Sequence, residues 1–569
     1  LFRSIRFNKF IQAQGIRSMK LIENLHFNNI RGDITGGITA GVVALPFAIA
    51  MGLASGAGAI AGLYGAIITG FFAALFGGTG AQVSGPTGPM TVVMALVVTQ
   101  FVTFFEGKID PLTGLVYTHD AALGAGLTIA FTTVVLGGLF QITFGLLKLG
   151  RFINLMPHPV TSGFMTGIGV IIIILQIPQV LGFYDIKGST LGIFSQLGDV
   201  PNYFINTGAI SIAIVTIVVV YLLPKKIGKF IPSPLFALIT GTLVLLFFPE
   251  FFSSNVEPLN NMILGDIPTG LPTFQMPSWE ASIVVDMIAS GMMLAILGSI
   301  DSLLTSLVSD EITRTHHKSD RELIGQGIGN TFSGLFGGLP GAGATMRTMT
   351  NVKAGGLTPI SGALHAVLLL AIVLGGAQYA KEIPLAVLGA ILVKVGTDII
   401  DWDYLKSLVS APKSGALIMV VVLGITVLYN LMAAVGVGLV MASLIFLQRM
   451  TDVQLASIVS VQTIEEASHL DEAHQELIRA GNTLFYQLNG PMSFGSAKGI
   501  VRDFSTKTNY NRVILDLSNV PIIDYTTSRG ISEVCNICTE KSAEITIVGA
   551  NTKVRHFLEN IGIDKAFLT

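Results

Sequence analysis

The chain has 569 residues, of which 51% are hydrophobic and only 12% charged, and its mean hydropathy is +0.70. Soluble globular domains carry about 25% charged residues, so this composition excludes a purely soluble protein and indicates many segments that cross a bilayer. The net charge of −2 gives no indication of a nucleic-acid partner, and none is expected.

The first residues are rich in basic side chains. Residues 1–20 hold no apolar run of signal-peptide length, so we expect residues 1–29 to form a basic cytoplasmic tail. Because the first methionine is Met19, residues 1–18 are also compatible with sequence upstream of the true start. The basic residues are Arg3, Arg6, Lys9, Arg17 and Lys20.

Apolar runs then follow one another, separated by short polar breaks. Each is close to the ~20 residues that cross a bilayer, so the sequence predicts about fourteen transmembrane segments in a transport domain over residues 30–450. The segments that start near residues 88 and 345 are short or broken. The segments are predicted at 34–55, 61–78, 88–105, 121–146, 160–178, 206–223, 233–248, 282–307, 321–338, 345–354, 358–376, 383–397, 414–429 and 431–447.

The loops between these segments differ in their content of Lys and Arg. If the N-terminus is cytoplasmic, the loops on its side hold most of the basic residues, whereas the stretch 249–281 on the other side holds none. We therefore expect a multi-pass protein of the cytoplasmic membrane with both termini in the cytoplasm. The basic residues of the expected cytoplasmic loops are Lys148, Arg151, Lys225, Lys226, Lys229, Arg314, Lys318, Arg321, Lys353, Lys406 and Lys413.

After about residue 455 the chain gains charge and alternates between strand-like and helix-like segments. Such alternation predicts a small α/β domain, which we place at residues 481–569 after a linker at 451–480. Cys535 and Cys538 supply too few ligands for a structural zinc site and are expected to be a reduced pair on a cytosolic helix. Strands are predicted at 482–489, 512–517 and 544–548, and helices at 496–504, 526–540 and 553–561.

Two of the predicted transmembrane segments are preceded by loops rich in Gly and Pro. Ser84–Met90 precedes the third segment and Gly338–Met346 the tenth, which are equivalent positions if the chain consists of two inverted repeats of seven segments. Paired broken helices mark the central site of many secondary transporters. Because a helix N-terminus carries unpaired N–H groups and a partial positive charge, two facing ends predict a small-anion site, with Thr87 and Thr345 as hydroxyl donors. The alternative is that these Gly and Pro residues only kink packed helices.

Ionisable residues within the predicted membrane segments are further candidates. Asp301 lies in the eighth segment, where a carboxylate is costly and usually functional. Thr305 shares its helix face, and a carboxylate with a hydroxyl suits a sodium ion; the alternative is a structural pairing of Asp301. Arg347 could hold the anion, pair with Asp301 or face cytoplasmic water. His365, in the eleventh segment, is expected to be a hydrogen-bonded packing residue.

These residues resemble those of the sulfate permease family, known in animals as solute carrier family 26. The resemblance covers the chain from about Asn28 to Ile563. It implies an all-α polytopic membrane domain, in which a core of segments 1–4 and 8–11 moves against a gate of segments 5–7 and 12–14, and it implies a homodimer. The motifs that carry it are Ala61–Gly65, Ser84–Met90, Ile300–Thr305, Gly341–Arg347 and Ile383–Leu388.

The tail resembles the sulfate-transporter and anti-sigma-factor-antagonist (STAS) domain. Val513–Ser518 followed by Ile523–Thr527 carries this resemblance. In anti-sigma antagonists the position matching Thr526 can be phosphorylated; here we expect Asp524 or Thr526 to cap the next helix. A cytosolic regulator is an implied partner of this domain.

Within the family, the likeness is greatest to the sodium-dependent bicarbonate transporters of cyanobacteria. By this resemblance, Asp301 and Thr305 would hold a sodium ion, the one expected coupling ion, and no other cofactor is expected. The likeness runs through Arg31–Asp33, Gly85–Thr91, Glu322–Gly327 and Gly341–Met346. The residues expected to bind the anion are Thr87, Gly88, Gly343, Ala344, Thr345 and Arg347.

Arg347 departs from the bicarbonate-transporter motif, in which a glycine stands at this position, whereas many other family members have an arginine there. A fixed positive charge could take over the role of sodium. The sequence therefore predicts secondary active transport of a small inorganic anion. Asp301 with Thr305 favours bicarbonate with sodium symport, and Arg347 favours sulfate or another small anion by proton symport or exchange.

Other classes of protein fit less well. Nucleobase transporters share the inverted-repeat architecture, but the tail domain argues against them. A membrane receptor or scaffold that signals through the tail is a further alternative, which uptake of labelled anion would exclude. We recognise no nucleophile–base pair, phosphate loop or metal motif in the sequence, so an enzyme is not expected.

Overall fold

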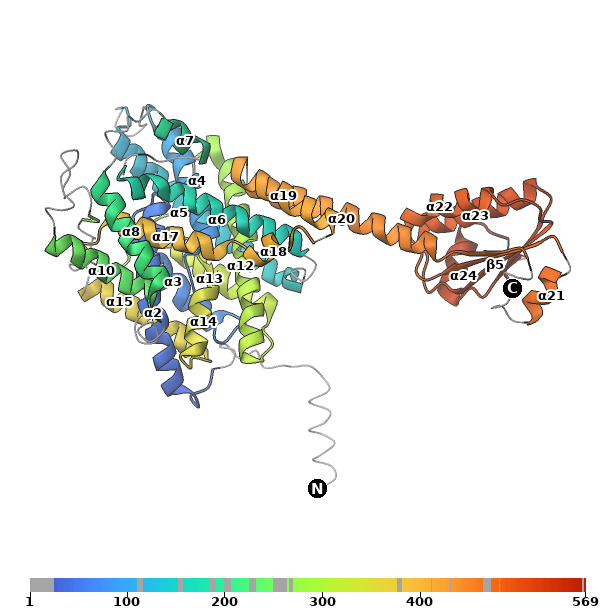
Figure 1. Ribbon diagram of the computed structural model, residues 1–569, viewed down its shortest axis with the longest axis horizontal. Helices are drawn as coiled ribbons and strands as arrows, with labels where there is room; N and C mark the ends of the chain where they lie inside the picture. The colour runs from blue at the N-terminus through green and yellow to red at the C-terminus, as the bar shows by residue number, and fades with distance from the viewer. Residues whose placement is uncertain are drawn as a thin grey trace, which may run out of the picture. The chain divides into compact units, whose positions relative to one another are not determined.

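The computed structural model contains two compact units, Leu1–Gly438 and Leu439–Thr569 (Figure 1). Residues 1–24 of the predicted tail, the basic loop 225–229 and the stretch 249–262 lie outside the described residues. The described residues are 25–109, 116–151, 157–183, 186, 190–198, 206–224, 232–248, 263–265, 270–375, 381–410, 412–429, 431–463, 472–479, 481–564 and 567–568.

Each of the predicted transmembrane segments corresponds to a helix. Seven helices in the described part of the chain are long and apolar enough to cross a membrane. The bounds differ most where α12 and α20 continue past residues 307 and 447, because hydropathy marks only the apolar part of a helix whose end is charged. The helices are α2 (Ile30–Ala54), α3 (Ala59–Phe76), α4 (Gly88–Phe105), α5 (His119–Leu146), α6 (His158–Leu181), α8 (Thr207–Leu222), α10 (Ser233–Phe247), α12 (Val284–Thr313), α13 (Ser319–Leu335), α14 (Thr345–Lys353), α15 (Pro359–Gly375), α17 (Leu385–Ile399), α19 (Lys413–Leu428) and α20 (Leu431–Ala456), with short helices η4 (Ala281–Ile283), α7 (Thr190–Gly198) and α18 (Trp402–Ser407) between them.

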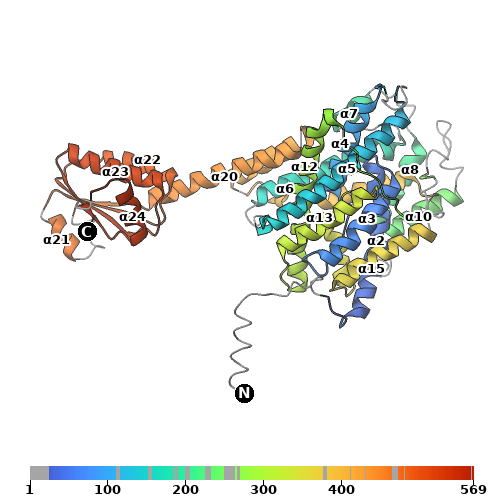
Figure 2. The ribbon, with the colours of Figure 1, turned by 180° about the vertical axis from the view of Figure 1, so that it is seen from behind.

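The membrane helices pack in two groups, as the predicted core and gate require. Helices α3, α5 and α13 lie side by side, and α2, α4, α12, α14 and α15 pack around them (Figure 2). The second group is built by α6, α8, α10, α17 and α19. Small residues allow close packing within the first group: a Cβ on Gly138 of α5 would lie 2.6 Å from the carbonyl oxygen of Gly327 of α13.

Two short strands cross at the centre of the first group. β1 (Ser84–Gly85) pairs antiparallel with β2 (Ala342–Gly343), and each strand leads into a half-helix, α4 or α14. Glycine is required at this crossing, because a Cβ on Gly341 would lie 2.7 Å from the carbonyl carbon of Gly85. The Gly-rich and Pro-rich loops of the two halves therefore meet, as expected for matching positions of an inverted repeat.

The second unit carries a mixed four-stranded sheet of order β3-β4-β5-β6. β3 pairs antiparallel with β4, and β4, β5 and β6 run parallel. Buried Leu484, Tyr486 and Val513 form one core with residues of α22 and α23, while Phe485 and Ile514 face a smaller core that includes Ile478 of α21. The elements are β3 (Val459–Val461), α21 (Glu472–Arg479), β4 (Thr483–Asn489), α22 (Phe494–Ser505), β5 (Arg512–Asn519), α23 (Tyr525–Glu540), β6 (Glu544–Val548) and α24 (Thr552–Asn560).

The predicted α/β pattern of this unit is confirmed, and two further elements appear. β3 and α21 lie in the stretch 451–480, which the sequence suggested as a linker. β3 has only three residues, too few for an alternating pattern to stand out. It is held in the sheet by its neighbour β4, a contact that local sequence does not encode.

Candidate functional site

A cavity of about 420 Å³ opens beside the crossing of β1 and β2, and both helix groups line it. Thr87, Gly88 and Thr345, from the N-terminal ends of α4 and α14, lie on one wall. The second group reaches the same place: a Cβ on Gly88 would lie 2.8 Å from Cδ1 of Ile399, on α17. The cavity therefore lies between the two groups, where a relative movement of core and gate would open or close it.

The α4 side of the crossing offers unused hydrogen-bonding groups. Thr87 is the N-cap residue of α4 and has an extended backbone. Its hydroxyl is buried and makes no hydrogen bond of normal geometry, but it acts on the Asp301 carboxylate, and the residue lines the cavity. Because the first N–H groups of a helix have no intrahelical acceptor, this end of α4 is suited to bind a small anion.

The α14 side of the crossing is bonded to α12. The Thr305 hydroxyl lies 2.8 Å from that of Thr345 and 2.9 Å from the carbonyl oxygen of Gly343, to which it donates. The Gly343 N–H donates to the Ser302 hydroxyl at 3.1 Å. Two residues of α12, one turn apart, thus fix the strand and the first residue of the half-helix that follows it.

Asp301 lies one turn before Thr305 on the same helix. It is only 8% exposed, and its Oδ2 is buried without a hydrogen-bond partner. A buried carboxylate oxygen without a partner is costly, and it is compensated when a cation binds. Carboxylate, hydroxyl and carbonyl oxygens are the ligands that hard cations prefer, and the sodium site at Asp301 and Thr305 stays a prediction.

Arg347, in the first turn of α14, reaches back to the other half of the crossing. Its Nη2 donates to the Pro86 carbonyl oxygen at 2.6 Å, and the residue is 3% exposed. Its Nη1 is buried without a partner. Asp301 and Arg347 act on each other electrostatically, but the structure shows no hydrogen bond between them. The side chain therefore braces the two half-helices and does not reach into cytoplasmic water.

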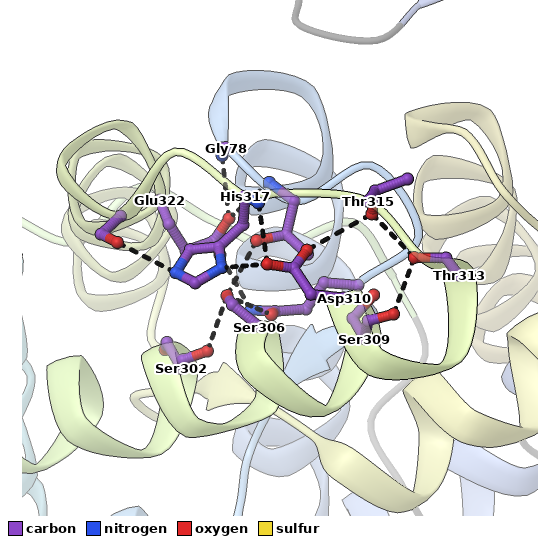
Figure 3. Close-up of polar contacts among 12 residues, drawn as sticks. Gly78, Ser302, Ser306, Ser309, Asp310, Thr313, Thr315, His317 and Glu322 are labelled. Atoms are coloured by element: carbon purple, nitrogen blue, oxygen red, sulfur yellow. Dashed lines mark hydrogen bonds and ion pairs between the residues drawn. The ribbon is translucent and has the colours of Figure 1, made fainter. Parts of the chain in front are cut away.

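A buried polar network lies next to the crossing and connects α12 and α13 to the segment that precedes β1. The Glu322 carboxylate accepts the N–H group of Gly78 at 2.8 Å (Figure 3) and that of Thr79 at 3.0 Å. It also accepts the side-chain amide groups of Gln82 and Gln326, both at 2.8 Å. The Ser306 hydroxyl donates to the Gln82 side chain at 2.9 Å. Because every one of these groups is buried, the network fixes the position of α12 relative to the start of β1.

A second cluster, also drawn in Figure 3, joins the end of α12 to the start of α13. The ring of His317 lies 2.7 Å from Asp310 through Nδ1 and 2.9 Å from the Ser319 hydroxyl through Nε2. No local sequence pattern marks this serine–histidine–aspartate contact. Ser319 is packed against the backbone of Gly150. We therefore interpret the cluster as a structural contact that stabilises the α12–α13 connection.

His365 behaves as a packing residue, in agreement with its local contacts. It is fully buried on α15, and its Nδ1 lies 2.9 Å from the carbonyl oxygen of Gly362. Gly70 of α3 faces the ring, where a Cβ would lie 3.2 Å from Nδ1.

The structure brings together all of the residues proposed from the sequence. Thr305 is fully buried behind the cavity wall and contacts the site through Thr345. Two charged residues that line the cavity were missed, Lys394 and Asp398 of α17. The signal for them was a lysine inside the predicted segment 383–397 with an acidic residue four positions later, directly after the segment's predicted end. The predicted residues that line the cavity are Thr87, Gly88, Asp301, Gly343, Ala344, Thr345 and Arg347.

The candidate positions in the second unit have structural contacts. The Asp524 carboxylate is the N-cap of α23 and accepts the Thr527 N–H at 2.8 Å, so Asp524, and not the exposed Thr526, supplies the predicted cap. Cys535 and Cys538 are free and buried. Burial raises the pKa of the two thiols to about 11 and about 12, which makes them poor nucleophiles.

Comparison with known proteins agrees with both units. The Sulfate permease family matches residues 30–422, and the STAS domain matches residues 474–569. The chain is 42% identical to the bicarbonate transporter BicA of Synechocystis over 549 residues, 96% of this chain and 93% of that protein. It is 29% identical to the putative sulfate transporter YvdB of Bacillus subtilis, covering 88% of each chain.

Solved structures give the same result for the fold. The transmembrane domain of a cyanobacterium bicarbonate transporter, BicA, is 46% identical with a TM-score of 0.64, and the match covers 73% of this chain and all of that one. The murine solute carrier 26 family member A9 anion transporter, 19% identical, has a TM-score of 0.78 over 98% of this chain and 94% of that one. At this identity the second likeness concerns the fold alone.

Proposed function

Since the chain belongs to the sulfate permease family, we propose that it is a secondary active transporter that moves bicarbonate across the membrane together with sodium. The observation that carries this proposal is the pair of half-helix ends in one cavity beside a buried carboxylate without a partner. The first feature suits a small anion and the second a small cation. A site of this kind binds and releases ions but offers no group for covalent chemistry.

The anion is proposed from the residues and from the relatives together. The ends of α4 and α14 supply N–H donors, and Thr87 supplies a hydroxyl that makes no hydrogen bond of normal geometry within the protein. Bicarbonate is a small planar oxyanion that such donors can bind. The 42% identity to the bicarbonate transporter BicA over nearly the whole chain supports bicarbonate over larger anions.

The cation is proposed from α12. Asp301 has a buried oxygen free to bind a cation, and Thr305 lies one turn further with its oxygen at the crossing strand. Sodium bound there would neutralise Asp301 and remove a negative charge from the wall of the anion cavity. Binding of sodium and of the anion would then favour each other.

A second candidate function is transport of sulfate or another small anion by proton symport or exchange. Arg347 favours it, because this buried cation is fixed at the crossing by Pro86. A permanent charge there could attract the anion without sodium. The 29% identity to a putative sulfate transporter agrees with this alternative.

We place the protein in the cytoplasmic membrane with both termini inside the cell, because of the asymmetry of Lys and Arg between its loops. We also expect a homodimer whose STAS domain binds a cytosolic regulator, as the family resemblance implies. Under this orientation α17 runs from the outside to the inside, which would place Asp398 near its cytoplasmic end.

Uptake of radiolabelled bicarbonate and sulfate into proteoliposomes, each with a sodium or a potassium gradient, tests the proposed function. We expect bicarbonate uptake that requires sodium and little uptake of sulfate. Sulfate uptake that is equal in sodium and potassium would favour the second candidate. No uptake of either anion by protein that elutes as one species in size-exclusion chromatography would contradict both.

A further inference from the structure

The wall of the cavity opposite the half-helix ends carries its own pair of charges. Lys394 and Asp398 lie one turn apart on α17, line the cavity and form an ion pair. Their side chains are 21% and 35% exposed. The Lys394 ammonium also lies 5.1 Å from the centre of the Tyr221 ring, on α8.

Lys394 differs from the other cation of the cavity in its accessibility. Arg347 is 3% exposed, and its guanidinium is held by the Pro86 carbonyl. Lys394 is several times more exposed and sits on a long flexible side chain. Among the described residues that line the cavity, it is therefore the cation that an anion arriving from water can reach first.

Asp398 is a partner of Lys394 that another negatively charged group could replace. An ion pair that remains partly in water contributes about 0–1 kcal/mol, and Asp398 is the more exposed of the two residues. A small oxyanion in the cavity offers the ammonium the same kind of oxygen atoms as the Asp398 carboxylate does. The two negative groups therefore compete for one cation.

We propose that Lys394 is an anion-binding residue of the second wall and that Asp398 is its internal competitor, which lowers the affinity of the cavity for the transported anion. The proposal rests on the proposed function of the cavity. It assigns the pair a role in capture and release: the anion binds Lys394 when it displaces Asp398, and the return of Asp398 promotes its release. Two walls on different helix groups would then contact one ion.

A purely structural role for the pair makes a different prediction. An ion pair between residues four apart can also stabilise α17, and Thr397 of the same helix is hydrogen-bonded to Tyr221 of α8. If stability were its only role, removal of either charge would impair the protein in the same direction. If the pair competes with the anion, the two removals have opposite effects on affinity.

The experiment measures the half-saturating bicarbonate concentration for uptake by the full chain in proteoliposomes at a fixed sodium concentration. For Lys394→Gln we expect a rise of about tenfold, and for Asp398→Asn a fall of about threefold, as expected for charges that interact near a water-filled surface. Lys394→Arg, which retains the charge, should stay within about twofold of the parent.

A charge-matched control comes from the exposed pair of Lys381 and Glu382, 3.8 Å apart and not part of the cavity lining. Lys381→Gln removes the same charge and should leave the half-saturating concentration unchanged. If Asp398→Asn raises that concentration as Lys394→Gln does, or if Lys394→Gln changes it no more than the control, the inference is wrong. A parent protein that takes up no anion would instead contradict the proposed function.

Discussion

The two half-helices that meet at the crossing have the same backbone design but different chemistry. Before α4, the Thr87 hydroxyl makes no hydrogen bond of normal geometry, although it acts on the Asp301 carboxylate, and the loop holds no ionisable side chain. Before α14, the Thr345 hydroxyl is bonded to Thr305, and Arg347 reaches from α14 to the Pro86 carbonyl. The first half thus leaves its donors open, whereas the second half is bonded and charged.

Under the proposed function, this difference would allow a repeated scaffold to bind two unlike ions. The open end of α4 suits the anion, and the bonded end of α14 joins the anion cavity to Asp301 and Thr305 on α12. Gly343 is part of both, because its carbonyl oxygen accepts from Thr305 while its N–H donates to Ser302. Under the proposed function, a change in either ion site would reach the other through this short strand.

Replacement of Asp301 should have the largest effect on the proposed separation of the anion site at α4 from the sodium site at α12. Asp301→Asn keeps the shape but removes the charge that would hold sodium, so we expect uptake in sodium to fall to the level seen in potassium. Uptake in the two cations, measured on the same preparation, checks this. Sodium stimulation that survives in the variant would place the cation elsewhere.

Removal of Arg347 should be the next most severe change. Arg347→Gly deletes a charged hydrogen bond between the halves, and a loss of about 1.5–3 kcal/mol of this kind corresponds to a rate lowered by about tenfold or more. Arg347 makes no hydrogen bond with Asp301 but acts on it electrostatically, so its removal takes away a competing positive charge, and the ratio of uptake in sodium to uptake in potassium should be kept or rise. A variant that loses this ratio, from a parent that had it, would assign the positive charge to the sodium site.

Removal of the Thr305 hydroxyl tests the cation site more gently. Thr305→Val nearly keeps the shape and removes one oxygen, so we expect the half-saturating sodium concentration to rise about tenfold, the equivalent of about 1.4 kcal/mol. The half-saturating bicarbonate concentration at high sodium should change little. A larger change for bicarbonate than for sodium would mean that Thr305 serves the anion.

The matched variants Thr87→Val and Thr345→Val test whether the ends of α4 and α14 serve different ions. We expect their effects to be the smallest of those described. Thr87→Val should raise the half-saturating bicarbonate concentration about fivefold, because one free donor is lost. Thr345→Val should mainly raise the half-saturating sodium concentration, since its hydroxyl is bonded to Thr305. Equal effects of both variants on bicarbonate would show that the two halves do not divide the ions.

Much of this arrangement could be predicted from the sequence, because the signals are local. The Gly-rich and Pro-rich loops at equivalent positions located both half-helices, and α4 begins and ends at the predicted residues. Asp301 stood out because it interrupts an apolar segment. The sequence also predicted the alternation of strands and helices in the STAS domain.

The remaining features depend on contacts between distant residues. In the local sequence, Glu322 is simply an acidic residue in the first turn of a helix. Only the fold brings Gly78 and Gln82 to its carboxylate. The bond from Arg347 to Pro86 spans the two repeats and likewise leaves no local pattern. Lys394 lies inside the predicted segment 383–397 and Asp398 directly after it, and only the fold shows that both line the cavity.

The most direct test of the central claim is the binding of sodium to the purified full-length protein, measured by titration calorimetry with and without bicarbonate. If the two ions occupy neighbouring sites joined by Gly343, bicarbonate must tighten sodium binding, and sodium must tighten bicarbonate binding by the same factor. We predict such coupling in the parent and its loss in Asp301→Asn. Sodium binding that does not depend on bicarbonate, or no sodium binding by protein that still transports bicarbonate, would contradict the account.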